Sequence, residues 1–187
     1  MPRVCPAFLS FFLDNPFRRL LFNTDKILGP YVREGQTAAD IGCGPGFFTI
    51  PLARLVGPAG RVIAVDLQQV MLDKTRKKAL REGVEDRITF HKCGADSLDL
   101  HELLDFALCF WMMHEVPSPE HLLKELAALM KPGALLLITE PKPHVRRKRF
   151  DATVASALRA GFIISGTPKI RGSYSVLLTV SNERSAK

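Results

Sequence analysis

The stretch that decides the fold is TAADIGCGPG, residues 37–46. Its first half is short and mostly apolar, as in a buried strand, and a glycine-rich turn follows at once. A helical pattern begins after the turn, at about residue 47. Glycine has no side chain, so a turn of this kind lets the backbone come close to a ligand. The stretch therefore predicts a ligand-binding loop at the carboxyl end of a strand over residues 37–41.

Outward from this loop, the chain alternates short apolar runs with amphipathic segments. Residues 133–139 form an uninterrupted apolar run, which is typical of a strand that is buried on both faces. Just before it, Lys131, Pro132 and Gly133 are expected to end a helix and to form a turn. The further predicted strands are residues 61–65, 87–93, 105–111, 133–139, 162–164 and 174–180, and the predicted helices are residues 47–56, 68–82, 120–130 and 145–160.

This alternation predicts an α/β fold with a doubly wound, mostly parallel sheet of seven strands. The segment between the last two strands is too short for a helix, so these strands are expected to pair antiparallel as a hairpin. Ligands of such sheets bind beyond the carboxyl ends of the strands. We expect two parts, a helical segment over residues 1–36 that covers the cleft as a lid, and a ligand-binding domain over residues 37–187.

The composition indicates a folded protein, because 47% of the 187 residues are hydrophobic and 24% are charged, which excludes wholesale disorder. No apolar run approaches the roughly 18 residues of a membrane span, which predicts a cytoplasmic location and no transmembrane segment. The four cysteines form no Cys-x-x-Cys pair, so we expect reduced thiols and no metal site.

The net charge of +7 is unevenly distributed. Residues 146–187 carry nine basic and two acidic side chains, whereas residues 37–145 carry 12 basic and 14 acidic ones. A slightly acidic central block argues against nucleic acid as a partner. The basic run over residues 146–149 is interpreted as a solvated face, with attraction of an anionic substrate, a nucleic acid or a membrane as the alternatives.

Two details of the loop favour S-adenosylmethionine over a dinucleotide as its ligand. Phe47 stands where the dinucleotide fingerprint has its last glycine, and Gly46 comes one residue early. The carboxylate of Asp40 would repel a pyrophosphate but would attract an ammonium and a sulfonium group.

Asp66 ends the second predicted strand, where an acid accepts hydrogen bonds from ribose hydroxyls. The alternative role of Asp66 is to cap the helix that begins near residue 68.

At this point the chain resembles a known family. Residues 40–46 resemble the first motif of the class I S-adenosylmethionine-dependent methyltransferases, and Val65 with Asp66 resembles the second. Residues 129–134, LMKPGA, resemble the segment before the fifth strand of that family. The nearest resemblance is to a small bacterial and archaeal group related to ubiquinone/menaquinone-type methyltransferases. It implies a Rossmann-like sheet with the strand order 3-2-1-4-5-7-6 and S-adenosylmethionine as the cofactor.

Further residues are expected to contact the cofactor. Leu67 would lie against the adenine, and Ala95 and Asp96 would supply a backbone donor and a carboxylate to the adenine edge. The related group often reads Gly-Asp-Ala here, whereas residues 93–96 read Cys-Gly-Ala-Asp, so the carboxylate is expected in a shifted register. The full predicted set is Asp40, Gly42, Cys43, Gly44, Asp66, Leu67, Ala95, Asp96 and Phe110.

The predicted function is transfer of a methyl group from S-adenosylmethionine to a small-molecule acceptor by direct displacement. His114 and Glu140 are the candidate catalytic residues, because they follow the fourth and fifth strands and a histidine can act as a base near neutral pH. His144 is interpreted as a helix-cap or core histidine. We expect a small substrate roof, or one shared in a homodimer. The alternatives are a methyltransferase acting on RNA or protein, and a non-catalytic S-adenosylmethionine-binding module.

Overall fold

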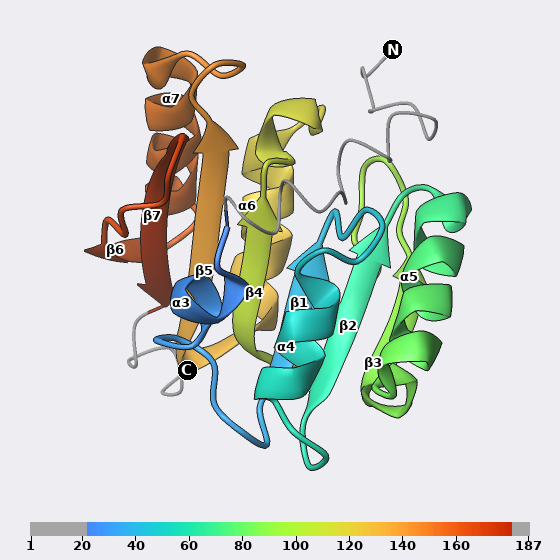
Figure 1. Cartoon of the computed structure of the whole chain (residues 1–187). Helices are drawn as coiled ribbons and strands as arrows, with labels where there is room; N and C mark the ends of the chain where they lie inside the picture. Colours follow the sequence, from blue (N-terminus) through green and yellow to red (C-terminus); the bar gives the residue numbers. More distant parts are fainter. Residues whose placement is uncertain (1–21, 181–187) are drawn as a thin grey trace. The chain divides into compact units, whose positions relative to one another are not determined.

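The computed structural model describes residues 22–180 (Figure 1). The chain forms two compact units, which divide between Cys93 and Gly94 and are called the first and the second unit below. All seven strands belong to one sheet, in the order β3-β2-β1-β4-β5-β7-β6. This order confirms the predicted fold class and the predicted place of the last strand between the fifth and the sixth.

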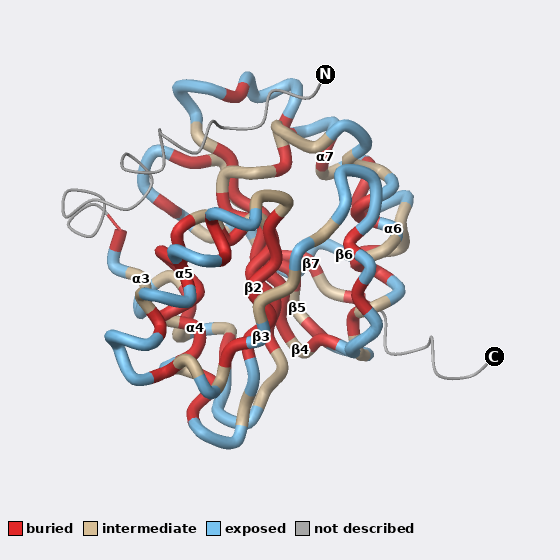
Figure 2. Tube along the Cα trace, turned by 90° about the vertical axis from the view of Figure 1, so that its right-hand side faces the viewer, coloured by how far each residue is buried: buried red, intermediate tan, exposed pale blue. Residues whose placement is uncertain are grey.

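The first unit is a parallel sheet of three strands that carries helices. β2 pairs parallel with both β1 and β3, and it is buried along almost its whole length, as the red tube in Figure 2 shows. Helices α4 and α5 contact each other and β2. The elements are α3 (Thr24–Leu28), β1 (Thr37–Ile41), α4 (Thr49–Leu55), β2 (Arg61–Asp66), α5 (Gln69–Glu82), η2 (Glu85–Arg87) and β3 (Ile88–Lys92).

The second unit contains the four remaining strands. β4 pairs parallel with β5, while β7 pairs antiparallel with both β5 and β6, which confirms the predicted terminal hairpin. Helices α6 and α7 contact each other, and α7 also contacts β6 and β7. The elements are β4 (Leu104–Phe110), η3 (Met113–Glu115), α6 (Pro119–Leu129), β5 (Met130–Pro141), α7 (Arg147–Arg159), β6 (Phe162–Gly166) and β7 (Ser173–Val180).

The start of β5 differs from the expectation. Residues 131–133 were expected to be a free turn, but β5 already begins at Met130 and contains them as an irregularity. Leu104 faces Met130 and Phe106 faces Leu135, so one residue of β4 faces four residues of β5. Gly133 has a φ of 76°, which gives the bend that this irregularity requires. Lys131 Nζ lies 2.7 Å from Asp105 Oδ2, and this contact joins β4 and β5 at the irregularity.

The predicted lid falls mostly on residues 1–21, which lie outside the described residues, so the lid stays a prediction. The described part of this segment is the short helix α3, whose N-cap Asn23 accepts a hydrogen bond from Lys26 N–H. α3 contacts α4, and Leu28 is fully buried. Across residues 22–180, no helix is both long enough and apolar enough to cross a membrane.

Candidate active site

The glycine loop of the first unit follows β1 directly. The N–H groups of Gly42 and Cys43 both donate to the carbonyl oxygen of Val65, at 2.9 Å each, so the loop is tied to the end of β2. Gly44 and Gly46 have φ values of 53° and 81°, which favour glycine. A Cβ at Gly46 would lie 2.7 Å from Thr75 Cγ2, whereas a Cβ at Gly44 would meet nothing within 4 Å. The backbone of Gly44 is thus held in place and left open on one side.

Asp66 connects this loop to the helix that follows. Its side chain is 8% exposed. Asp66 Oδ2 accepts from Gly44 N–H at 2.9 Å, and Asp66 Oδ1 accepts from Gln68 N–H at 2.8 Å. Gln68 is the N-cap residue of α5, so Asp66 holds the residue that caps the helix and does not itself cap it. Each carboxylate oxygen retains acceptor capacity for a second hydrogen bond, as from a ribose hydroxyl.

The environment of Asp66 opposes its charge in part. Burial raises the pKa of the Asp66 carboxyl above its usual value. Hydrogen bonds from the N–H groups of Gln68, Gly44 and Leu67 act in the opposite direction and offset part of this rise. Hydroxyl groups that donate to the carboxylate would favour the charged form further. A ligand that brings two hydroxyls to Asp66 therefore offsets the cost of burying its charge.

Two more predicted residues, Asp40 in β1 and Cys43 in the loop, are buried. Asp40 is 3% exposed, and its Oδ2 accepts from the Thr49 hydroxyl at 2.6 Å, which joins β1 to the first residue of α4. Cys43 is also buried, and burial, followed by the carboxylates of Asp40 and Asp66, raises the pKa of its thiol well above the usual range. The thiol is therefore neutral at physiological pH. Leu67 is half-buried at the end of β2.

These residues fit the predicted cofactor. Hydroxyl donors match the carboxylate of Asp66, cationic groups match the buried carboxylate of Asp40, and the open side of Gly44 gives room for close approach. The geometry brings together the predicted Gly44 and Asp66 by direct contact. Sequence reasoning missed Thr75, whose side chain closes the loop from α5 by donating to the Gly44 carbonyl at 2.8 Å.

Three predicted cofactor residues belong to the second unit. Ala95 and Asp96 are exposed in a turn that is closed by a hydrogen bond from Gly94 N–H to the Ser97 carbonyl, at 3.0 Å. Phe110 is buried at the end of β4, with its ring centroid 5.3 Å from that of Trp111. Cofactor contacts of these three residues stay predictions.

The two candidate catalytic residues are in direct contact. His114 Nδ1 lies 2.5 Å from Glu140 Oε2, and the backbone N–H of His114 donates to Glu140 Oε1 at 3.1 Å. The Glu140 side chain is 1% exposed and that of His114 is 9% exposed. When Nδ1 carries the proton and donates it to Glu140, Nε2 is left as the proton acceptor. The pair thus has the arrangement of a base that is oriented by a carboxylate.

Other side chains surround this pair. The ring of His144 meets the ring of His114 edge to face, with 4.8 Å between centroids, so His144 contacts the pair and does not cap α7. His114 Nε2 lies 3.8 Å from Glu115 Oε1. Arg149 of α7 donates to the His114 carbonyl oxygen at 2.5 Å. The turn that carries His114 is therefore held by both β5 and α7.

Trp111 begins that turn in an unusual conformation. Its φ is 59°, which for a residue other than glycine costs about 1–3 kcal/mol. Its N–H donates to the Thr139 carbonyl and its indole Nε1 donates to the Ser173 hydroxyl, both at 2.9 Å. The sequence offered no signal for this strain, because Trp111 reads as an ordinary apolar residue at a strand end. Among residues 22–180, no three His, Cys, Asp or Glu side chains gather as metal ligands would.

The sheet order, the glycine loop and its acidic partner define the class I S-adenosylmethionine-dependent methyltransferases, as predicted. A family model described as a methyltransferase domain matches residues 38–133, and the chain belongs to this methyltransferase family. It is similar to a crystal structure of a SAM-dependent methyltransferase from Aquifex aeolicus, with a TM-score of 0.85, 25% identity, and coverage of 95% of this chain and 100% of that one.

Curated relatives carry the same family signal. The chain is 31% identical to the ubiquinone/menaquinone biosynthesis C-methyltransferase of Hahella chejuensis, over 68% of this chain and 53% of that protein. It is 32% identical to the demethylmenaquinone methyltransferase of Lactobacillus johnsonii, over 71% of this chain and 52% of that protein. The chain thus spans about half the length of the curated relatives it matches.

Proposed function

We propose that this protein transfers a methyl group from S-adenosylmethionine to a small-molecule acceptor by direct displacement. The observation that carries the proposal is the contact of Asp66 with Gly44 and Gln68. It fixes a buried carboxylate and an open glycine backbone side by side, as a ribose and its neighbouring groups require. Asp66 would bind the ribose, and Asp40 would attract the cationic end of the cofactor.

When bound, the cofactor supplies the electrophilic methyl group, and the chain's own residues orient the reaction and manage the proton. Asp66 and Asp40 would hold the cofactor so that displacement at its methyl group would transfer that group to the acceptor's nucleophilic atom and leave the sulfur as a neutral thioether. Where the acceptor must also lose a proton, Nε2 of His114 takes it. Glu140 would hold the His114 ring in the orientation that presents Nε2 and would stabilise the resulting imidazolium.

The acceptor we propose in finer detail is the reduced, hydroquinone form of a quinone, which is methylated at a ring carbon. One relative is named a ubiquinone/menaquinone biosynthesis C-methyltransferase and another a demethylmenaquinone methyltransferase, and their similarity to this chain supports the proposal. A ring carbon that gains a methyl group must lose its proton to restore the ring. Methylation at a ring carbon therefore needs a base, which the His114–Glu140 pair would provide. Methylation of an atom that is already deprotonated would need no base.

The predicted homodimer is part of the proposal. β6 is an edge strand, and Ile163 and Ile164 on it are 52% and 47% exposed. An exposed edge with apolar side chains suits pairing with another chain. Sedimentation velocity should show a dimer that Ile164→Lys weakens, and a wild-type protein that stays monomeric across the accessible concentrations would contradict it.

Calorimetry with S-adenosylmethionine and S-adenosylhomocysteine tests the central proposal. Binding of both, followed by transfer of a labelled methyl group to a reduced demethylmenaquinone, is the expected result. Folded protein that binds neither compound would refute the function. Binding without transfer to any quinone-type acceptor would leave the cofactor assignment in place and overturn the acceptor.

A further inference from the structure

Exposed basic side chains gather in the second unit where β5 leads into α7. A hydrogen bond from Lys142 N–H to the Gly172 carbonyl, at 2.9 Å, joins this segment to the loop between β6 and β7, where Arg171 lies. Lys142 Nζ and the Arg147 guanidinium also lie over the same ring, that of Tyr174. We call this cluster the basic rim, and its members are Lys142, Arg146, Arg147, Lys148, Arg149 and Arg171.

Acidic partners are scarce in the basic rim. Arg147 pairs with Asp151 at 2.8 Å, and Arg149 donates to the backbone carbonyl of His114. Within residues 22–180, the side chains of the other four members form no salt bridge with a carboxylate. The first turn of α6 shows the opposite arrangement, since Glu120 there pairs with both Lys124 and Arg159.

The position of the rim is unfavourable for the helix. The N-terminus of α7 carries the positive end of the helix dipole, and cations there are disfavoured by about 0.3–1 kcal/mol each. Its N-cap residue Arg146 makes no side-chain cap, and its first turn contains no acid. Arg147 and Arg149 have partners within the chain, but Arg146 and Lys148 are exposed and form no salt bridge in the described residues. The charges therefore suit a partner outside the chain.

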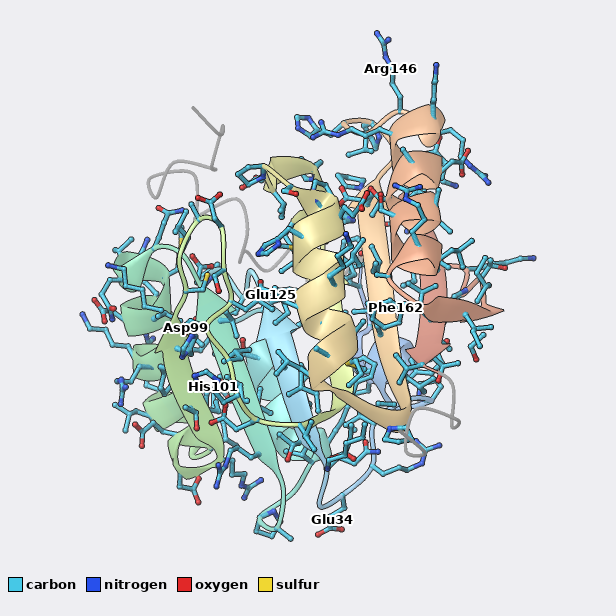
Figure 3. All side chains as sticks on the ribbon, turned by 180° about the vertical axis from the view of Figure 1, so that it is seen from behind. Glu34, Asp99, His101, Glu125, Arg146 and Phe162 are labelled. Atoms are coloured by element: carbon cyan, nitrogen blue, oxygen red, sulfur yellow. The ribbon has the colours of Figure 1, made fainter. Side chains whose placement is uncertain are left out.

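The direction of the Arg146 side chain suits a partner outside the chain. Arg146 projects away from the end of α7 and beyond the ribbon of the chain (Figure 3). Arg149 differs from Arg146, because its guanidinium contacts the carbonyl oxygen of His114. Clusters of four to eight Lys and Arg at a helix bind anionic lipid headgroups, at about 1 kcal/mol per charge near the surface. The six cations of the rim fall in this range.

We propose that the basic rim docks this protein on the surface of an anionic phospholipid bilayer. The choice of lipid over RNA rests partly on the proposed function, because quinone-type acceptors with isoprenoid tails reside in membranes. The rim itself also argues against single-stranded RNA, whose binders stack bases on aromatic side chains. Tyr174, the aromatic residue under the rim, is stacked on Phe150 at 5.5 Å and covered by Lys142 and Arg147.

Co-sedimentation of the full chain with lipid vesicles tests the proposal. Vesicles of phosphatidylcholine with added phosphatidylglycerol should bind the protein, vesicles of phosphatidylcholine alone should not, and added salt should release it. The double variant Arg146→Gln/Lys148→Gln removes two exposed charges that form no salt bridge in the described structure. It should weaken partition to anionic vesicles by roughly 10- to 30-fold.

A matched control removes the same charge elsewhere. Arg61→Gln/Lys77→Gln changes two exposed cations of the first unit and should leave vesicle binding unchanged. Equal binding by the rim variant and the wild type, or equal loss in both double variants, would overturn the proposal. Retention on RNA that the rim variant abolishes, without vesicle binding, would overturn it in favour of RNA. The vesicle test needs neither cofactor nor acceptor, so failed S-adenosylmethionine binding would refute the proposed function and leave the docking surface standing.

Discussion

In the glycine loop, most contacts involve backbone groups, and they join the turn after β1 to β2 and α5 of the first unit. At the His114–Glu140 pair, the Glu140 side chain contacts both the ring and the backbone N–H of His114, and the two residues are 26 positions apart on different elements. The loop is stabilised by four short links to Val65, Asp66 and Thr75, whereas the pair depends on a strained Trp111 and on Arg149.

This difference corresponds to two kinds of chemistry. A cofactor of constant shape can be held by backbone geometry, which tolerates change in the side chains around it. Handling a proton on an acceptor requires a particular side chain in a particular orientation. Substitutions in the two regions should therefore fail in different ways, with loss of cofactor affinity in the loop and loss of turnover at the pair.

The largest effect is expected from Glu140→Gln. An amide cannot orient His114 and stabilise its protonated form as the carboxylate does, so kcat should fall by about 10²–10⁴-fold. S-adenosylmethionine affinity should stay the same, because Glu140 lies outside the glycine loop. Single-turnover methyl transfer and calorimetry on the same variant measure both. A fall in affinity with unchanged kcat would show that the pair serves binding and not proton transfer.

The combination of Glu140→Gln with His114→Asn sharpens this result. Residues that act as one unit are not additive, so the double variant should be about as slow as the slower single variant. Independent, multiplying losses would mean that the two side chains act separately despite their contact. Thermal unfolding of each variant checks that the second unit remains folded.

Asp66→Ala should give the next largest effect, on binding. It would remove the proposed acceptor for two ribose hydroxyls, and water can enter the space, so the expected loss is on the order of 2–4 kcal/mol, or tens- to several hundred-fold in affinity. Stability should also fall, because the N–H groups of Gly44 and Gln68 lose their acceptor. Calorimetry and thermal unfolding separate the two effects, and unchanged cofactor affinity would defeat the ribose assignment.

Two alanine substitutions within the loop should differ in stability. Gly44→Ala introduces strain from a positive φ alone, while Gly46→Ala adds a clash with the buried Thr75. The second should therefore be less stable than the first by about 1–3 kcal/mol in chemical denaturation, the usual cost of overpacking. Equal stabilities would mean that α5 moves freely away from the loop.

The smallest expected effect is the pH dependence of cofactor binding. Burial raises the pKa of Asp66, so the folded protein holds this proton more tightly than the unfolded chain does. The resulting contribution to the free energy of unfolding is full below the pKa of Asp66 in the unfolded chain, near 3.8. It is lost as pH rises through the raised pKa of Asp66 in the folded protein. Cofactor hydroxyls favour the carboxylate, so affinity should rise over the same interval and then level off. Calorimetry across acidic pH measures this rise, and a variant Asp66→Asn with the same slope would assign it to another group.

The first unit could be predicted well from the sequence, because the residue types that its glycine loop requires lie close together along the chain. A strand that ends in glycines with positive φ, followed by an acid at the end of the next strand, can be recognised from residues 37–66 without knowledge of packing. Gly46 and Asp66 were recognised in this way. Thr75 was not, because its contact with Gly46 depends on how α5 packs, and threonine on a buried helix face has no distinctive spacing.

The second unit was predicted in its elements but not in its contacts. His114 and Glu140 were both proposed, but their pairing arises from the parallel arrangement of β4 and β5, which brings the two strand ends together. The strained φ of Trp111 left no trace in the sequence, since apolar residues at strand ends are common. The segment at Pro132 and Gly133 was predicted to be a turn before the strand, but it is an irregularity within β5. These two residue types are common in both structures, and only the pairing of β5 with β4 distinguishes them.

The close approach of Gly46 and Thr75 has a consequence for the history of the chain. A side chain at position 46 is compatible only with a smaller residue at position 75, so a change at one position alters what is tolerated at the other. Because Thr75 also donates to the Gly44 carbonyl, shrinking it would release the loop from α5. An alternative pair of residues can thus evolve here only through an intermediate with a weakened loop. Related sequences should therefore retain glycine at position 46 together with threonine at position 75.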